Sequence, residues 1–131
     1  MKTFCDTVGI GPPKTTLEEC WYMKIYHGIR KEAGTVVTVT NGNVFSKLSP
    51  RFDLRNHSPT GFEWGYGGSG PAQLSLAILA DHFGDDRVAQ EFYQNFKFRV
   101  IGRLTKDEWT ITARQIDSVI QELKESEINN G

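Results

Sequence analysis

The chain has 131 residues, with 15 Lys and Arg against 16 Asp and Glu, and a net charge of -1 at pH 7. This length suits one domain, and the balanced charge argues against nucleic acid or anionic lipid as a general surface partner, leaving only a local basic patch open. No apolar stretch is long enough to cross a bilayer, and the N-terminus lacks the apolar core of a signal peptide. The two cysteines, Cys5 and Cys20, match no metal-ligand spacing or disulfide framework. These features predict a cytoplasmic protein with no membrane partner.

The first elements along the chain are an arm and a strand. Residues 1–19 contain glycines and prolines without a sustained apolar period, which predicts a flexible N-terminal arm. Residues 21–29 are rich in aromatic and β-branched side chains and predict the first strand. A single domain is therefore expected over residues 20–126, with a frayed C-terminus at 127–131.

A hairpin is predicted next. Residues 35–40 read TVVTVT, a second strand, and Asn41-Gly42 precedes Val44-Phe45. This pattern predicts a hairpin over residues 36–46 whose turn has positive φ at both central positions. Residues 48–55 alternate again, which places Phe52 and Leu54 inward and the charged residues between them on the opposite side.

The sequence from Gly61 to Gln73 (GFEWGYGGSGPAQ) is the most unusual segment. The alternation of Phe62, Trp64 and Tyr66 predicts an aromatic strand in the centre of the sheet. Glycines 67 and 68 are expected to adopt positive φ, and Ser69 or Gly70 to cap a helix that has Pro71 in its first turn. The free amides of such a helix start attract anions, although neither a P-loop nor a G-x-G-x-x-G motif is present. The alternative is that the glycines serve only close packing.

Helices dominate the second half. Residues 71–83 are apolar nearly all round and predict a buried helix that ends at Gly84. Asp85 or Asp86 is expected to cap the next helix, whose apolar stripe is formed by Val88, Phe92, Phe96 and Val100. Residues 109–111 predict a short strand, and Thr112 with Gln115 predicts a capping box at the start of a last helix. The predicted fold class is α+β: a small antiparallel sheet, formed by the hairpin and the aromatic strand, packed by about three helices.

The candidate binding site combines this helix start with charged residues shortly before it. A phosphate or carboxylate is expected on the glycine-rich loop, with two arginines and a histidine as side-chain contacts. The alternative is that the arginines only pair with Asp53 or Glu63 on the solvated surface. The candidate residues are Arg51, Arg55, His57, Glu63, Trp64, Gly67, Gly68, Ser69 and Gly70.

Catalysis is less favoured. There is no G-x-S-x-G elbow for a serine hydrolase, and the three histidines, His27, His57 and His82, show no paired metal-ligand spacing. No catalytic residue, metal or cofactor is therefore predicted. An acid–base pair of Glu63 with His57 is a third interpretation. Stacking of nucleic-acid bases on the aromatic strand is disfavoured, because a chain of this size needs its large aromatics in the core.

One resemblance adds to this interpretation. The block HSPTGFEWGYGGSGPAQLSLAILAD (residues 57–81), followed by FYQNFKFRVIGRL (92–104) and WTIT (109–112), resembles an uncharacterised domain family found in bacterial, phage and plasmid sequences. The resemblance covers roughly residues 21–123. It implies a mobile-element or host-defence setting and carries over no catalytic roles.

The combined hypothesis is a non-enzymatic domain that binds an anionic ligand, a nucleotide or another phosphate-bearing molecule, at the glycine-rich helix start. The alternative is a protein-interaction or inhibitor module of a mobile element, in which the glycine loop is purely structural.

Overall fold

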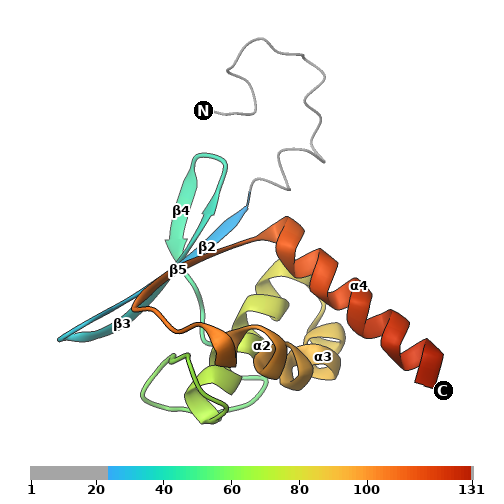
Figure 1. Ribbon diagram of the computed structural model, residues 1–131. Coiled ribbons are helices and arrows are strands. Elements are labelled where there is room, and N and C mark those ends of the chain that lie inside the picture. Colours follow the sequence, from blue (N-terminus) through green and yellow to red (C-terminus); the bar gives the residue numbers. More distant parts are fainter. Residues whose placement is uncertain (1–23, 131) are drawn as a thin grey trace.

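The computed structural model describes residues 24–130 and has an α+β fold (Figure 1). Three helices lie on one side of a four-stranded antiparallel sheet, so the predicted fold class is confirmed. The predicted arm and both cysteines fall outside the described residues, and the domain bounds stay predictions. None of the described helices is long and apolar enough to span a membrane. The elements are β2 (Ile25–Lys31), β3 (Gly34–Asn41), β4 (Val44–Lys47), α2 (Ser69–Phe83), α3 (Asp86–Arg99), the 3₁₀ turn η1 (Ile101–Arg103), β5 (Glu108–Thr112) and α4 (Ala113–Asn130).

The sheet has the strand order β4-β3-β2-β5, so its central strands are β3 and β2. Tyr26 in β2 lies opposite Val39 in β3 and Ile111 in β5, and all three side chains are buried. Side chains of a strand alternate between the two faces, so these residues define the face that the helices cover.

The predicted hairpin is confirmed as β3 and β4, but its turn differs in detail. Asn41 is paired with Val44, so the two central turn residues are Gly42 and Asn43. Only Gly42 has positive φ, at 65°. The expectation of positive φ at both central positions was therefore wrong, because the pairing extends one residue further along β3 than the Asn-Gly pattern suggested.

Gly28 in β2 makes room for a tryptophan. It lies opposite Trp109 in β5, and a Cβ atom on Gly28 would lie 2.3 Å from Cζ2 of that indole. Trp109 in turn meets Trp64 edge to face, with ring centroids 5.4 Å apart and an interplanar angle of 89°. Because Gly28 has no side chain, Trp109 can lie against its backbone and contact Trp64. This aromatic pair joins the sheet to the segment that carries residue 64.

The helices agree with their sequence signals. α2 is buried along nearly its whole length, as its apolar composition predicts, and Gly84 ends it with φ 62°. Asp85 accepts hydrogen bonds from the backbone N–H groups of residues 87 and 88 and caps α3. The capping box is complete: the Thr112 N–H donates to Gln115 Oε1 (2.9 Å), and the Gln115 N–H donates to Thr112 Oγ1 (3.2 Å).

The predicted aromatic strand does not exist. Residues 61–68 form no strand, and the fourth strand of the sheet is β5 instead. Gly61 and Gly65 have φ values of 121° and 95°, so the backbone bends on both sides of Trp64 and the alternation of aromatics does not produce one face. Trp64 is buried, whereas Tyr66 is 52% exposed.

Two further expectations near the start of α2 were wrong. Positive φ occurs at Gly65 and not at Gly67 or Gly68. Gly68 is the N-cap, with φ -107°, and no side chain caps the helix. Ser69 is therefore the first helical residue, where its hydroxyl is not in the N-cap position from which side chains reach the free amides.

The segment 48–55 is a turn and not an extended, alternating stretch. The Leu54 N–H donates to the Arg51 carbonyl (3.0 Å), and Arg51 has φ 56°. Phe52 is exposed at this turn rather than directed inward. A local hydrogen-bonded turn has thus overridden the period-two pattern.

Candidate functional site

The glycines at the start of α2 each have a close neighbour on the side where a Cβ atom would project. A Cβ on Gly68 would lie 2.5 Å from the Tyr66 ring, and one on Gly67 would lie 3.2 Å from the Phe98 ring. A Cβ on Gly70 would lie 2.7 Å from Cβ of Glu63. A side chain at any of these three positions would require its neighbour to move, which agrees with the packing role of the alternative interpretation. An anion on the loop stays a prediction.

Glu63 pairs with a residue that sequence reasoning missed, Arg30 at the end of β2. Arg30 Nη2 donates to Glu63 Oε1 (2.8 Å) and to the Trp64 carbonyl (3.1 Å), while Nη1 donates to Asp107 Oδ1 (2.7 Å). Its guanidinium carbon also lies 4.7 Å from the centroid of the Trp64 ring. These bonds to Glu63 and Asp107 raise the pKa of Arg30. Glu63 and Trp64 therefore belong to a structural network that attaches residues 61–68 to the sheet.

Arg51 is likewise engaged with carboxylates. Its Nε and Nη2 donate to the two carboxylate oxygens of Asp53 (3.0 and 2.9 Å), and Nη2 also donates to Asp86 Oδ2 (3.1 Å). Both contacts raise the pKa of Arg51. The expected pair of Arg51 with Asp53 is present, and the Arg51 side chain also contacts Asp86 at the start of α3.

Gln73, in the second turn of α2, holds the loop that carries Arg55 and His57. Its side chain is fully buried. Oε1 accepts from the backbone N–H groups of His57 (2.7 Å) and Ser58 (3.2 Å). Nε2 donates to the carbonyls of Pro50 (2.6 Å) and Arg55 (3.0 Å). All of these bonds reach backbone atoms, so one side chain fixes the path of residues 50–58.

Arg55, His57 and Lys97 form a group that we call the cationic patch. The His57 ring lies 2.8 Å from the Tyr93 hydroxyl through Nε2. The pKa of His57 is lowered, first by burial and then by the positive charges of Arg55 and Lys97. Within residues 24–130, neither Arg55 nor Lys97 forms an ion pair with a carboxylate. Among the described residues, the patch therefore contains two cations without a carboxylate partner, beside an imidazole whose protonation they oppose.

Lys97 is the buried member of the cationic patch. It lies near the end of α3, where cations interact favourably with the helix dipole. In the structure it is only 7% exposed, and Nζ lies 4.3 Å from the centroid of the Phe98 ring. A lysine on the side of a helix that faces the protein interior is unusual, and this position is the sequence signal that could have identified Lys97.

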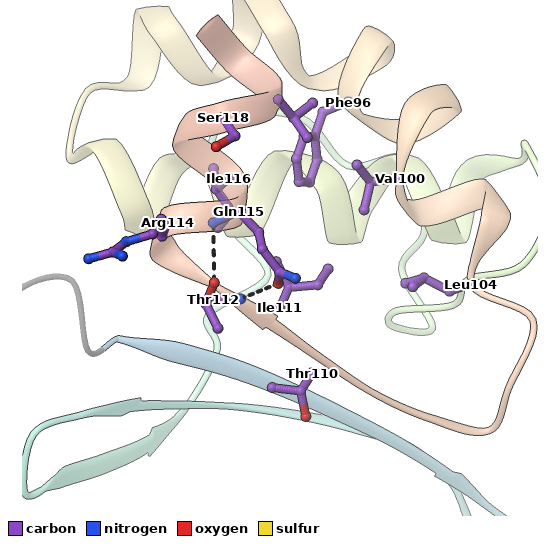
Figure 2. Close-up of a pocket in the computed structure, with 11 residues that line it drawn as sticks. Phe96, Val100, Leu104, Thr110, Ile111, Thr112, Arg114, Gln115, Ile116 and Ser118 are labelled. Carbon is purple, nitrogen blue, oxygen red and sulfur yellow. Dashed lines mark hydrogen bonds between the residues drawn. The ribbon is translucent and has the colours of Figure 1, made fainter. Parts of the chain in front are cut away.

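An apolar pocket lies elsewhere, between the free side of β5, α4 and the C-terminal end of α3 (Figure 2). Its volume is about 600 Å³, and Figure 2 shows the Thr112–Gln115 capping box at its wall. None of the sequence-predicted site residues lines it. Its walls are formed by Phe96, Val100, Leu104, Thr110, Ile111, Thr112, Arg114, Gln115, Ile116, Ser118 and Val119.

The described part of the chain contains no group of three or more His, Cys, Asp or Glu side chains that could hold a metal ion. His57 and Glu63 contact different partners, Tyr93 and Arg30. These two described side chains therefore have separate partners, and an acid–base role for them stays a prediction.

The protein is thus a small α+β domain whose sheet is covered by helices on one face. It also has a loop fixed by Gln73 and a cationic patch. The chain belongs to a family of unknown function (DUF6166), whose model matches residues 26–122. This match confirms the resemblance drawn from the central glycine-aromatic block. No curated protein matched the chain, and no solved structure matched it.

Proposed function

We propose that this domain is not an enzyme and that it binds a phosphate-bearing anion, such as a nucleotide, at the cationic patch beside the start of α2. The observation that carries the proposal is the absence, within residues 24–130, of a carboxylate partner for Arg55 and Lys97. Arg55 and Lys97 both act on His57 through their positive charge, and a bound anion offsets that charge. A phosphate with two negative charges matches two permanent cations.

The surroundings support an anion at this place. Gln73 fixes the backbone of the loop before any ligand arrives, which lowers the entropy lost on binding. Ser69 is exposed at the start of α2, where the helix dipole favours negative charge. Arg51, Glu63 and Trp64 have internal partners, so we assign the role of the second cation to Lys97 instead.

Removing either permanent charge is expected to weaken binding of pyrophosphate by at least about fivefold, or about 1 kcal/mol. The variants are Arg55→Ala, which leaves the backbone carbonyl bound by Gln73, and Lys97→Met, which keeps an apolar stem for packing. Thermal-shift screening against phosphates, nucleotides and oligonucleotides identifies a ligand, and calorimetry then measures its dissociation constant.

Arg87→Ala is the matched control, because Arg87 is an exposed arginine at the opposite end of α3. Ten residues of helix place it about 15 Å from Lys97 along the axis. The proposal is wrong if no anion stabilises the protein, or if Arg87→Ala weakens binding as much as Arg55→Ala.

The second candidate is a protein-interaction or inhibitor module of a bacterial or phage mobile element, acting in the cytoplasm. It is favoured by β4, an edge strand whose residues are all exposed, with Val44 at 65% and Phe45 at 70%. An edge strand with unpaired backbone groups and apolar side chains is a site where a strand of another chain can add to the sheet.

This candidate predicts that the protein self-associates or captures a protein partner and that Phe45→Ser abolishes the contact. Light scattering and pull-down experiments with the wild type and this variant measure both. A strictly monomeric protein that captures nothing through β4 would exclude the module, whereas changes at the cationic patch should leave such contacts intact.

A further inference from the structure

We infer that the apolar pocket beside β5 is the docking site of a segment of the chain itself, residues 14–20 (KTTLEEC), and that the Leu17 side chain enters the pocket. No residue of the cationic patch lines this pocket, so the inference does not depend on the proposed function. The argument starts from the pocket, continues with the strand edge at its wall, and ends with the place where the N-terminal residues join the fold.

The pocket has the size of a binding site. Its volume is about 600 Å³, which is more than a packing defect in a small core provides. Val100, Leu104 and Val119 line it, and all three side chains are only partly buried. Apolar surface that gathers around an opening of this kind is typical of a place where another molecule or segment binds.

The wall formed by β5 favours a peptide as the occupant. The Asp107 carbonyl and the Ala113 N–H both bond to backbone groups of β2 or the residue before it. Because these directions alternate along an antiparallel strand, the N–H and C=O of Thr110 point to the opposite edge of β5. No strand of residues 24–130 pairs with that edge, and Thr110 lies at the strand side of the pocket in Figure 2. An extended segment can bond to such an edge and direct a side chain into the pocket.

The N-terminal residues join the described fold close to this pocket. The Lys24 carbonyl accepts a hydrogen bond from the N–H of Ala113 (3.0 Å), the first residue of α4 (Figure 1). A second hollow on α4 shares Arg114 and Ser118 with the pocket. Its described lining residues are Arg114, Asp117, Ser118, Gln121 and Glu122. A chain that leaves Lys24 across the first turns of α4 therefore passes from this hollow to the pocket.

Leu17 is within reach of the pocket. It lies seven positions before Lys24, which allows at most about 25 Å of extended chain. The distance along α4 from Ala113 to Ser118 is about 7.5 Å. Because the segment is attached beside the pocket, its effective concentration there is on the order of millimolar, so that even a weak contact is formed in most molecules.

The charges of the segment also match the site. Leu17 is the one apolar residue among residues 14–19, and Glu18 and Glu19 follow it directly. Arg114 is the one charged residue among those that line the pocket. Entry of Leu17 would therefore place carboxylates near a cation, an arrangement that favours this segment over a neutral or basic one.

Disulfide trapping in the full chain tests the inference, because Cys20 lies three positions after Leu17. In a Cys5→Ser background, Ser118→Cys is expected to form an intrachain disulfide with Cys20 under mild oxidation, identified by mass spectrometry. Thr40→Cys is the matched control. Thr40 lies opposite Ile25, so it is beside the point where the segment joins the fold but on the side of β2 away from β5. An undocked segment would link to position 40 at least as readily as to position 118.

A second pair of variants tests the role of Leu17. Leu17→Asp is expected to lower the yield of the link between positions 20 and 118 about tenfold, because the burial of one leucine side chain is lost. Thr16→Asp adds the same charge at a neighbouring position, whose side chain points to the other side of an extended segment, and should leave the link intact.

Three results would overturn the inference. The first is an equal yield of links at positions 118 and 40, and the second is an unchanged yield in Leu17→Asp. The third is a link between positions 20 and 118 of two different chains, since a second copy would then occupy the pocket in place of the chain's own segment.

Discussion

Replacing Gln73 by leucine is expected to lower the free energy of unfolding by about 3–5 kcal/mol. The leucine fills a similar volume, but it leaves four backbone groups without their partners: the N–H groups of His57 and Ser58 and the carbonyls of Pro50 and Arg55. Unsatisfied buried polar groups cost about 1–3 kcal/mol each, and some regain water when the loop moves. The loss should therefore exceed that of an ordinary core substitution.

Urea denaturation followed by circular dichroism measures this loss. Gln121→Leu is the matched control, because Gln121 is an exposed residue of α4 and its change should stay within about 0.5 kcal/mol. Anion affinity of any folded Gln73→Leu protein should fall as well, since the loop that carries Arg55 and His57 loses its attachment. A Gln73→Leu protein as stable as the wild type would show that the four bonds do not persist in solution.

Replacing Trp64 by alanine is expected to cost about 3–5 kcal/mol, the range for large aromatic side chains lost from a core. The Trp64 indole is 1% exposed, and its Nε1 donates to the Lys106 carbonyl (2.9 Å). It also meets Trp109 edge to face and has the Arg30 guanidinium over its ring. The substitution would leave a cavity where the loop, β2 and β5 meet. Movement of one of these elements alone could not fill that cavity.

Chemical denaturation and near-ultraviolet circular dichroism follow this variant. Trp64→Phe is the comparison variant, because it retains an aromatic ring and loses the indole N–H donor. It should lower the free energy of unfolding by about 1–2 kcal/mol. Equal effects of the two substitutions would mean that the hydrogen bond, and not the buried ring, carries the stability. Unchanged stability in Trp64→Ala would contradict the packing described here.

Local signals in the sequence predicted the helical half and the hairpin. The Thr112–Gln115 box and the Asp85 cap are formed by hydrogen bonds between residues two or three apart, so their pattern is visible in a short window. The apolar composition of α2 likewise predicted that the helix is buried on all sides, because its sequence has no polar face to contact water.

The errors arose where backbone conformation departs from the residue pattern. Alternating aromatics around Trp64 have the period of a strand, but positive φ at Gly61 and Gly65 turns the chain and leaves Tyr66 exposed. The same pattern around Phe52 was overridden by the local turn at Arg51. Periodicity reports a face only where the backbone is regular.

The candidate site was predicted in part. Arg55 and His57 lie together, as their nearness in sequence suggested, whereas Arg51 pairs with Asp53, as the alternative expected, and also with Asp86, 35 residues away. Arg30 and Lys97 were missed because the residues on which they act lie in other elements: Glu63 is 33 residues from Arg30, and His57 is 40 positions before Lys97. Contacts at such separations leave no trace in composition or spacing.

The placement of β5 beside β2 has a consequence for the order of assembly during synthesis. The hairpin of β3 and β4 can pair as soon as it has left the ribosome, but one side of β2 stays open until residues 108–112 emerge. Until then, neither Trp109 nor Ile111 covers Gly28 and Tyr26, and the nascent chain exposes a bare sheet edge to other molecules. Contacts of such long sequence separation also slow folding, so a ribosome-bound chain that ends before Glu108 should depend on chaperones.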